Sequence, residues 1–209
     1  MLRLSMSERR SDIFTTIYQA RLWGAENPSG PGSLDRFVEP LWRELPILFK
    51  DFDVSSILDL GCGTFGWIKN ALNDEIDYTG CDIVEDLISV LVAKESSDNV
   101  RFKVLDAVTD ELPYADLVVC RSVLFHLSNE DIMATIENVK KSGAKWLLTT
   151  SFTYRGIPVN EDIRSGGFRR INLELEPFGL PSPERVVFDL DGDPDNFSTA
   201  LCLWKVSDL

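Results

Sequence analysis

The segment from Ile57 to Gly66, which reads ILDLGCGTFG, constrains the fold of this chain more than any other part of it. An apolar run ends in an acid and turns on glycines, and a helical pattern from Trp67 to Leu72 follows. A strand that turns on glycines into a helix lets a ligand approach bare backbone at a helix N-terminus. Such a unit forms the nucleotide-binding end of a doubly wound α/β sheet.

The acid in this segment, Asp59, bears on the choice of ligand. A carboxylate two residues before the first glycine would repel a pyrophosphate and attract an ammonium group. S-adenosylmethionine (SAM) carries an ammonium on its methionyl end, so the sequence favours SAM as the cofactor. Gly61, Gly63 and Gly66 also satisfy the dinucleotide pattern GxGxxG. An NAD-dependent oxidoreductase is therefore the alternative enzyme.

Strand and helix patterns alternate along the rest of the chain. Apolar spacing predicts helices at 11–22, 34–45, 66–73, 85–95 and 128–141, and strands at 56–60, 78–83, 100–105, 115–120 and 146–150. Two last runs, 185–190 and 200–206, flank the turn 192–196 and predict an antiparallel hairpin. Five βα units and a closing hairpin predict a mixed, doubly wound seven-stranded sheet, which is a Rossmann-like fold. We expect one domain over 1–209, with an N-terminal helical cap or lid at 1–33 and the core at 34–209.

Composition excludes several classes of function. The formal net charge of −13 disfavours a nucleic-acid surface. The four cysteines are far apart and have no CxxC spacing, which is typical of free thiols in a reducing cytosol, and we predict no metal site. A signal peptide and a long apolar span are both missing from the sequence, so we expect a cytoplasmic protein without a membrane partner. The oligomeric state is left open.

The residues that follow the strands are the candidate ligand contacts, because ligands of doubly wound sheets bind past the carboxyl ends of the strands. Asp82 can accept hydrogen bonds from two ribose hydroxyls. Asp106 can accept from an adenine amino group, while the Ala107 amide donates to a ring nitrogen. The predicted cofactor contacts are Asp59, Gly61, Cys62, Gly63, Asp82, Ile83, Asp106, Ala107, Cys120, Arg121 and, from the lid, Trp23.

At these positions the chain resembles the class I SAM-dependent methyltransferases. The run from Asp59 to Gly63 resembles their glycine-rich motif, and Asp82 and Asp106 resemble their ribose and adenine-side acids. The segment 120–127 (CRSVLFHL) is similar to the stretch after their fourth strand. The resemblance covers roughly residues 34–206, and in the loop 29–33 and the run 167–169 it narrows to a subgroup of small methyltransferases. It implies that an acceptor binds beyond the fifth strand.

Arginines gather in the region where the resemblance places the acceptor. Arg155, Arg164, Arg169 and Arg170 outnumber Glu161 and Asp162 there, although the chain as a whole is acidic. Arginine recognises carboxylate or phosphate through two parallel hydrogen bonds. We predict that Arg155, Arg169 and Arg170 bind the acceptor, and a solvated loop with scattered charge is the equal alternative.

The sequence offers few candidates for proton transfer. His126 is the only histidine, and its apolar neighbours make a packing role as plausible as a general base. Tyr154 is the second catalytic candidate. Arg121 either pairs with an acid or contacts the methionyl carboxylate. The predicted function is O- or N-methylation of a small anionic metabolite or saccharide. A SAM-binding regulatory protein without catalysis is the alternative from another class.

Overall fold

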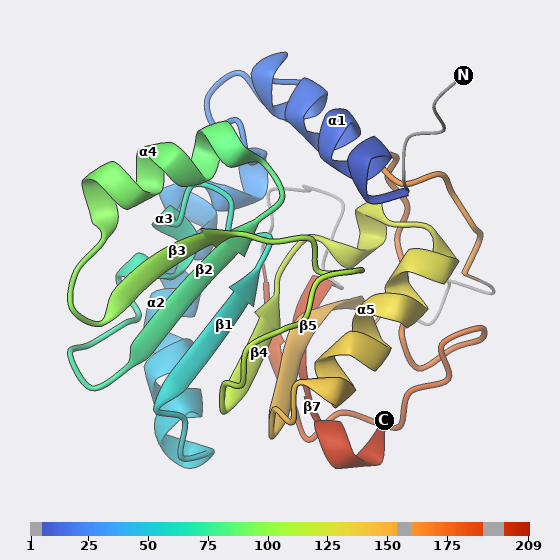
Figure 1. Cartoon of the computed structure of the whole chain (residues 1–209). Coiled ribbons are helices and arrows are strands. Elements are labelled where there is room, and N and C mark those ends of the chain that lie inside the picture. The colour runs from blue at the N-terminus through green and yellow to red at the C-terminus, as the bar shows by residue number, and fades with distance from the viewer. Residues whose placement is uncertain (1–5, 154–159, 190–198) are drawn as a thin grey trace.

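A seven-stranded sheet forms the centre of the computed structural model, which describes residues 6–153, 160–189 and 199–209. The strand order is β3-β2-β1-β4-β5-β7-β6, and this confirms the predicted doubly wound sheet (Figure 1). The bounds are β1 Ser56–Leu60, β2 Asp77–Asp82, β3 Val100–Val104, β4 Leu117–Cys120, β5 Trp146–Phe152, β6 Arg185–Phe188 and β7 Thr199–Lys205. The turn predicted at 192–196 lies outside the described residues, as do Tyr154 and Arg155.

Pairing along the sheet creates the edge at which a ligand is expected. β1 is parallel to β2 on one side and to β4 on the other, so the strand order reverses at β1. β7 runs antiparallel to β5, with Trp146 opposite Lys205 and Phe152 opposite Thr199. The carboxyl ends of β1 and β4 therefore diverge toward different crossovers and leave a crevice between them.

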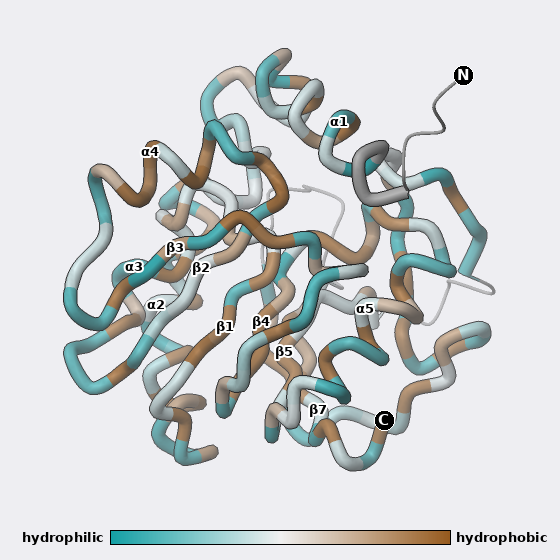
Figure 2. The backbone as a smooth tube through the Cα atoms, viewed as in Figure 1, coloured by the Kyte–Doolittle hydropathy of each residue, from teal (hydrophilic) through white to brown (hydrophobic). Residues whose placement is uncertain are grey.

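Helices cover both faces of the sheet. Their bounds are α1 Met6–Gln19, α2 Asp35–Asp51, α3 Gly66–Lys69, α4 Glu85–Glu95 and α5 Asn129–Lys141, with 3₁₀ turns η1 Pro31–Ser33, η2 Leu124–His126 and η3 Val206–Asp208. In Figure 1, α5 lies in front of the sheet, α2 lies behind it, and α1 crosses above the carboxyl edge. β4 and most of β7 are buried on both sides, which fits their continuous apolar sequences (Figure 2).

Several elements differ from the sequence-based expectation. The helix α2 continues to Asp51 through two prolines, because Leu41, Leu45 and Leu48 extend its buried stripe. The helix α3 has only four residues. No helix was predicted in the connection 105–116 between β3 and β4 or in the connection between β5 and β6, and none lies in the described part of either. None of the helices in the described ranges has the length and apolarity of a membrane span.

Candidate functional site

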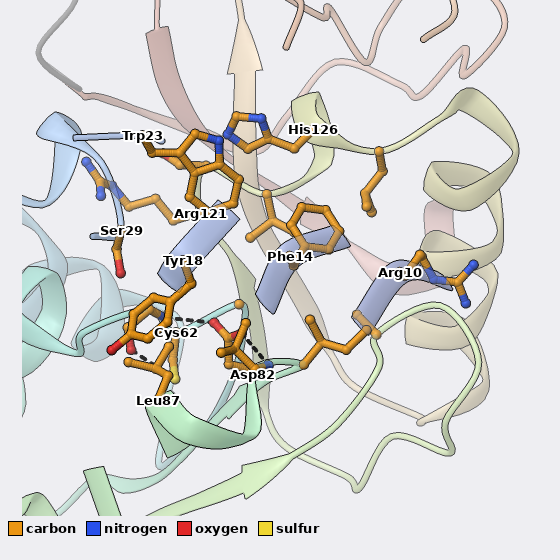
Figure 3. Close-up of a pocket in the computed structure, with 18 of the residues that line it drawn as sticks. Arg10, Phe14, Tyr18, Trp23, Ser29, Cys62, Asp82, Leu87, Arg121 and His126 are labelled. Atoms are coloured by element: carbon orange, nitrogen blue, oxygen red, sulfur yellow. Dashed lines mark hydrogen bonds between the residues drawn. The ribbon is translucent and has the colours of Figure 1, made fainter. Parts of the chain in front are cut away.

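A cavity lies at the carboxyl edge of the sheet, between the glycine loop after β1 and the segment after β4, with α1 as its roof (Figure 3). We call it the edge cavity. Of the predicted cofactor contacts, its wall includes Trp23, Gly61, Cys62, Gly63, Asp82, Ile83, Asp106, Ala107 and Arg121. Asp59 and Cys120 are not part of that wall. Phe14 and Tyr18 of α1 cover the cavity from above.

The glycine loop has a backbone that side chains would disrupt. Gly61 and Gly63 have φ angles of +71° and +53°, which strain any other residue. A Cβ at Gly61 would lie 2.4 Å from Val123 Cγ2, and one at Gly63 would lie 2.7 Å from Ser29 Oγ. The amides of Gly61 and Cys62 both donate to the Cys81 carbonyl, which fixes the loop to the end of β2. The glycines therefore let three segments meet closely. These are the glycine loop, the segment after β4 and the loop 29–33, which we call the lid loop.

Asp82 stands at the end of β2 and faces the edge cavity. Its Oδ2 accepts from the Gly63 amide at 3.2 Å, and its Oδ1 accepts from the Val84 amide at 3.0 Å. Burial raises the pKa of Asp82, and the two backbone donors oppose that rise. Both oxygens are thus held in place, and each keeps a lone pair that a ligand hydroxyl can use.

Asp106 is engaged by a residue that the sequence analysis did not single out. Arg10 of α1 donates to Asp106 Oδ2 from both Nε (3.1 Å) and Nη2 (2.8 Å), and its Nη1 donates to Asp131 Oδ1 at 3.0 Å. The other oxygen of Asp106 accepts from the Val108 amide. Arg10 and Asp106 are both buried. Nothing in the sequence around a single basic residue in a helix indicates a partner that lies far away along the chain. The contact of Arg10 could therefore not be predicted from the sequence.

Asp59 lies below the glycine loop and not in the cavity wall, which differs from the contact predicted with an ammonium group. Its Oδ2 accepts from Trp67 Nε1 at 3.1 Å and from the Tyr78 hydroxyl at 2.8 Å, and its Oδ1 has no hydrogen-bond partner. Complete burial raises the pKa of Asp59 to about 7. The carboxyl group joins β1 to β2 and α3 inside the core.

Arg121 is paired with an acid, which is one of the two roles left open for it. Its Nε and Nη2 donate to the two oxygens of Asp189 at 2.7 and 2.8 Å, and Nη2 also donates to the Gly32 carbonyl. The guanidinium lies 5.2 Å from the centre of a Trp67 ring. The side chain thereby holds the lid loop 29–33 against the edge cavity.

His126 and Trp23 stack on each other where the edge cavity ends (Figure 3). Their ring centres are 4.6 Å apart with an interplanar angle of 22°. His126 Nδ1 lies 2.7 Å from the Gly167 carbonyl, which can only accept, so Nδ1 carries the proton and Nε2 is left as an acceptor. Burial lowers the pKa of His126 to about 4. The imidazole is therefore neutral and fixed in one tautomer at neutral pH.

A second cavity of about 580 Å³ adjoins the first, and we call it the loop cavity. It lies between the lid loop and the run 166–168. The two cavities share five wall residues, which are Trp23, Ser29, Ser33, Ser122 and His126. The two cavities are therefore neighbours, and His126 belongs to the wall of both.

The arginines predicted to bind the acceptor do not line either cavity where the structure describes them. Arg169 donates from Nη1 to the Leu124 carbonyl at 3.3 Å, from Nη2 to Asn129 Oδ1 at 2.8 Å, and from Nε to the Glu161 carbonyl at 3.2 Å. It therefore holds the segment after β4 against the run 160–170. Arg170 is not part of either wall.

Two further expectations concern the four cysteines and a metal site. The four cysteines are free and buried, and burial raises the pKa of the Cys62 and Cys120 thiols, so both stay protonated. Within the described ranges, no cluster of three or more histidine, cysteine or acidic side chains could hold a metal ion.

Known proteins resemble this chain in one domain and in the fold. Residues 57–143 match the family model of a methyltransferase domain. No curated protein matches the sequence significantly. The solved structure of PigF with S-adenosylhomocysteine (SAH) is 15% identical with a TM-score of 0.64, and the match covers 92% of this chain and 62% of that one.

Two further solved structures share the fold at similar distance. Human N-acetylserotonin methyltransferase in complex with SAM is 16% identical with a TM-score of 0.53, covering 95% of this chain and 56% of that one. Magnesium protoporphyrin IX methyltransferase from Synechocystis PCC 6803 with bound SAH is 12% identical with a TM-score of 0.56, covering 97% and 88%. The chain thus spans less than two thirds of the length of PigF and of the human enzyme. SAH or SAM is bound in these three solved structures.

Proposed function

We propose that this chain, a SAM-dependent methyltransferase by the domain that it carries, methylates a small molecule held in the loop cavity beside His126. The observation that supports the proposal is the shared wall of the two cavities. Methyl donor and acceptor have to meet in line, and a site made of two joined cavities provides that placement. Placement is the main contribution that a protein makes when the group to be transferred is already activated.

The residues of the edge cavity fit SAM. Gly61 and Gly63 line the edge cavity without side chains, so a ligand there would meet backbone. Asp82 would accept from the ribose hydroxyls, and the Ala107 amide would contact the adenine ring. Asp106 would act there only alongside Arg10, with which it is already paired.

Group transfer needs a proton acceptor when a hydroxyl is methylated. When bound, SAM would supply a methyl group on a sulfonium; an acceptor lone pair would form the new bond to carbon, and the carbon–sulfur bond would break with its electrons staying on sulfur. The hydroxyl oxygen becomes strongly acidic as that bond forms, and His126 Nε2 takes its proton. An imidazole with a pKa of about 4 suffices for such a proton and is always available at neutral pH. Nδ1 keeps its hydrogen bond to Gly167 throughout.

The charge of the acceptor and the location of the protein stay predictions. The anionic acceptor was inferred from Arg155, Arg169 and Arg170, and of these Arg169 is engaged with carbonyl groups of the protein. Arg155 lies outside the described residues. Tyr154, the second catalytic candidate, also lies outside the described residues.

Calorimetry with SAM, SAH and NAD separates the enzyme classes. We expect SAM and SAH to bind and NAD to show no heat of binding. Tight binding of NAD without binding of SAH would overturn the proposal in favour of the oxidoreductase. A protein that binds SAM but forms no SAH with any hydroxyl or amine acceptor would instead be a regulatory SAM-binding protein.

A further inference from the structure

We propose that the loop cavity binds a planar, uncharged aromatic compound and that a hydroxyl group on this compound is the methyl acceptor. The inference rests on the proposed function and adds to it the chemical class of the substrate. Three features of the cavity carry it, namely the aromatic wall, the charge of that wall, and a hydroxyl group without a partner.

Aromatic side chains surround the loop cavity. Phe168 lies edge-on to Phe125, with ring centres 5.3 Å apart and an interplanar angle of 76°, and its ring centre is 5.9 Å from that of His126. Trp23 completes this wall through its stack on His126. Edge-to-face and offset-stacked neighbours are the environment that a planar ring prefers. A saturated ring of equal size would gain the apolar contact and lose that preference.

Two residues at this cavity present apolar surface to solvent. Phe168 is 58% exposed and Leu22 is 67% exposed, and both belong to the cavity wall. Large apolar side chains that stay exposed beside a hollow offer contact area to an apolar ligand. The wall therefore favours a ligand with an apolar body.

The described part of the wall carries no formal charge. Among the described residues that line the loop cavity, none is an arginine, lysine, aspartate or glutamate. The two arginines of the neighbouring edge cavity are already paired, Arg121 with Asp189 and Arg10 with Asp106. A charged group that enters such a cavity loses water and finds no opposite charge. The cavity thus selects an uncharged ligand.

Ser122 provides the polar contact. Its Oγ is buried and has no hydrogen-bond partner among the described residues, and the residue lines both cavities. Its φ angle of +57° is unusual for a serine, and its amide is held by Thr150 Oγ1 at 2.8 Å. Strained backbone and an unsatisfied hydroxyl at a cavity are features of a binding site. Ser122 and His126 both belong to the wall that the two cavities share. A ligand hydroxyl that bonds to Ser122 Oγ would therefore lie at this wall.

Three matched probes test the substrate class on the full chain saturated with SAH. The probes are 2-naphthol, decahydro-2-naphthol, which is saturated, and 2-naphthoate, which is anionic. We expect calorimetry to show the tightest binding for 2-naphthol. With SAM in place of SAH, we expect mass spectrometry to detect 2-methoxynaphthalene.

Two phenylalanine variants locate the probe. Phe168→Ala should weaken 2-naphthol binding by roughly 2- to 10-fold, which corresponds to the loss of one or two aromatic contacts. Phe188→Ala is the matched control, because Phe188 is 67% exposed and lies on β6 outside the loop cavity. Ser122→Ala should weaken the binding of 2-naphthol more than the binding of naphthalene, which has no hydroxyl group. Phe168→Ala and Phe188→Ala should keep the SAH affinity of the original chain, because neither residue lines the edge cavity.

Several results would overturn the inference. If decahydro-2-naphthol bound as tightly as 2-naphthol, the cavity would be apolar without a preference for aromatic rings. Tighter binding of 2-naphthoate than of 2-naphthol would support the anionic acceptor. A probe that binds Phe168→Ala as tightly as the original chain, or that binds and is never methylated, also contradicts it. In each of these cases SAH still binds, so the proposed function survives. If SAH itself fails to bind, the proposed function fails as well.

Discussion

Arg10 Nη2 lies 2.8 Å from Asp106 Oδ2, although 96 positions separate the two residues in the sequence. The contact joins the lid helix α1 to the acid that follows β3. Because Arg10 also pairs with Asp131 in the first turn of α5, one side chain connects three parts of the chain around the edge cavity. These ion pairs therefore hold α1 in place at the wall of the edge cavity.

Arg10→Ala should leave two carboxylates without their cation. Breaking a buried ion pair from one side costs about 3–5 kcal/mol of folding free energy. We expect urea unfolding to show a loss of this size, or limited proteolysis to show a detached α1. Arg43→Ala is the control, since Arg43 is exposed on α2 and pairs only with Glu39 among the described residues. It should change the unfolding free energy by less than about 0.5 kcal/mol. Similar losses in both variants would refute the role of Arg10.

Asp82→Ala should weaken SAM and SAH together, because both share the ribose. Each charge-assisted hydrogen bond is worth about 1.5–3 kcal/mol, so the dissociation constants should rise at least roughly 10-fold. Calorimetry measures both ligands. Asp77→Ala tests the specificity of the effect, since Asp77 begins the same strand at an exposed position and pairs with Arg101. Unchanged SAH affinity in a folded Asp82→Ala protein would remove Asp82 from the cofactor site.

Gly61→Ala should destabilise the glycine loop and reduce SAH affinity. The new Cβ would lie 2.4 Å from Val123 Cγ2 at a φ angle of +71°. Strain of this kind costs about 1–3 kcal/mol, measured as unfolding free energy. Gly66→Ala is the matched control, because a Cβ there has no neighbour within 4 Å. Its stability should change by less than about 0.5 kcal/mol. The prediction fails if both variants behave alike.

His126→Asn should retain a donor to the Gly167 carbonyl and remove the proton acceptor Nε2. We expect the turnover of a hydroxyl acceptor to fall by about 10²–10⁴-fold while SAH affinity stays the same. The pKa of about 4 means that the imidazole of the original chain is neutral above that pH. Its rate should therefore be flat around neutrality and decline as the pH falls toward 4. An equal rate for the variant would leave His126 with a packing role only.

Asp59→Asn should change how stability depends on pH. The folded pKa of about 7 lies above the ordinary value of 3.8, so the folded chain binds the extra proton between these limits. The stabilising contribution of that proton is complete below pH 3.8 and is lost as the pH rises through 7. Relative to Asp59→Asn, the original chain should thus become less stable over this window, by at most about 4 kcal/mol. Parallel pH profiles from chemical unfolding would contradict the shift.

The sequence by itself determined the sheet and the place of the site. Apolar periodicity is local, so it predicts strands and helices within a few residues of their bounds. Parallel strands place their carboxyl ends at one edge, so Gly61, Asp82 and Asp106 had to converge there whatever the rest of the chain did. The differences fell on helix bounds, since α2 continues to Asp51 and α3 ends at Lys69.

The tertiary structure alone decided which polar groups meet. The Asp59 carboxyl group lies in the core, and Arg169 donates to carbonyl groups of the protein. Arg10 pairs with Asp106, which was expected to contact only the cofactor. The reach and direction of a side chain depend on how distant segments pack, and buried polar groups take whichever partner that packing brings near. The neutral state of His126 has the same origin, because burial and the Gly167 carbonyl set it, and neither is encoded in the neighbouring residues.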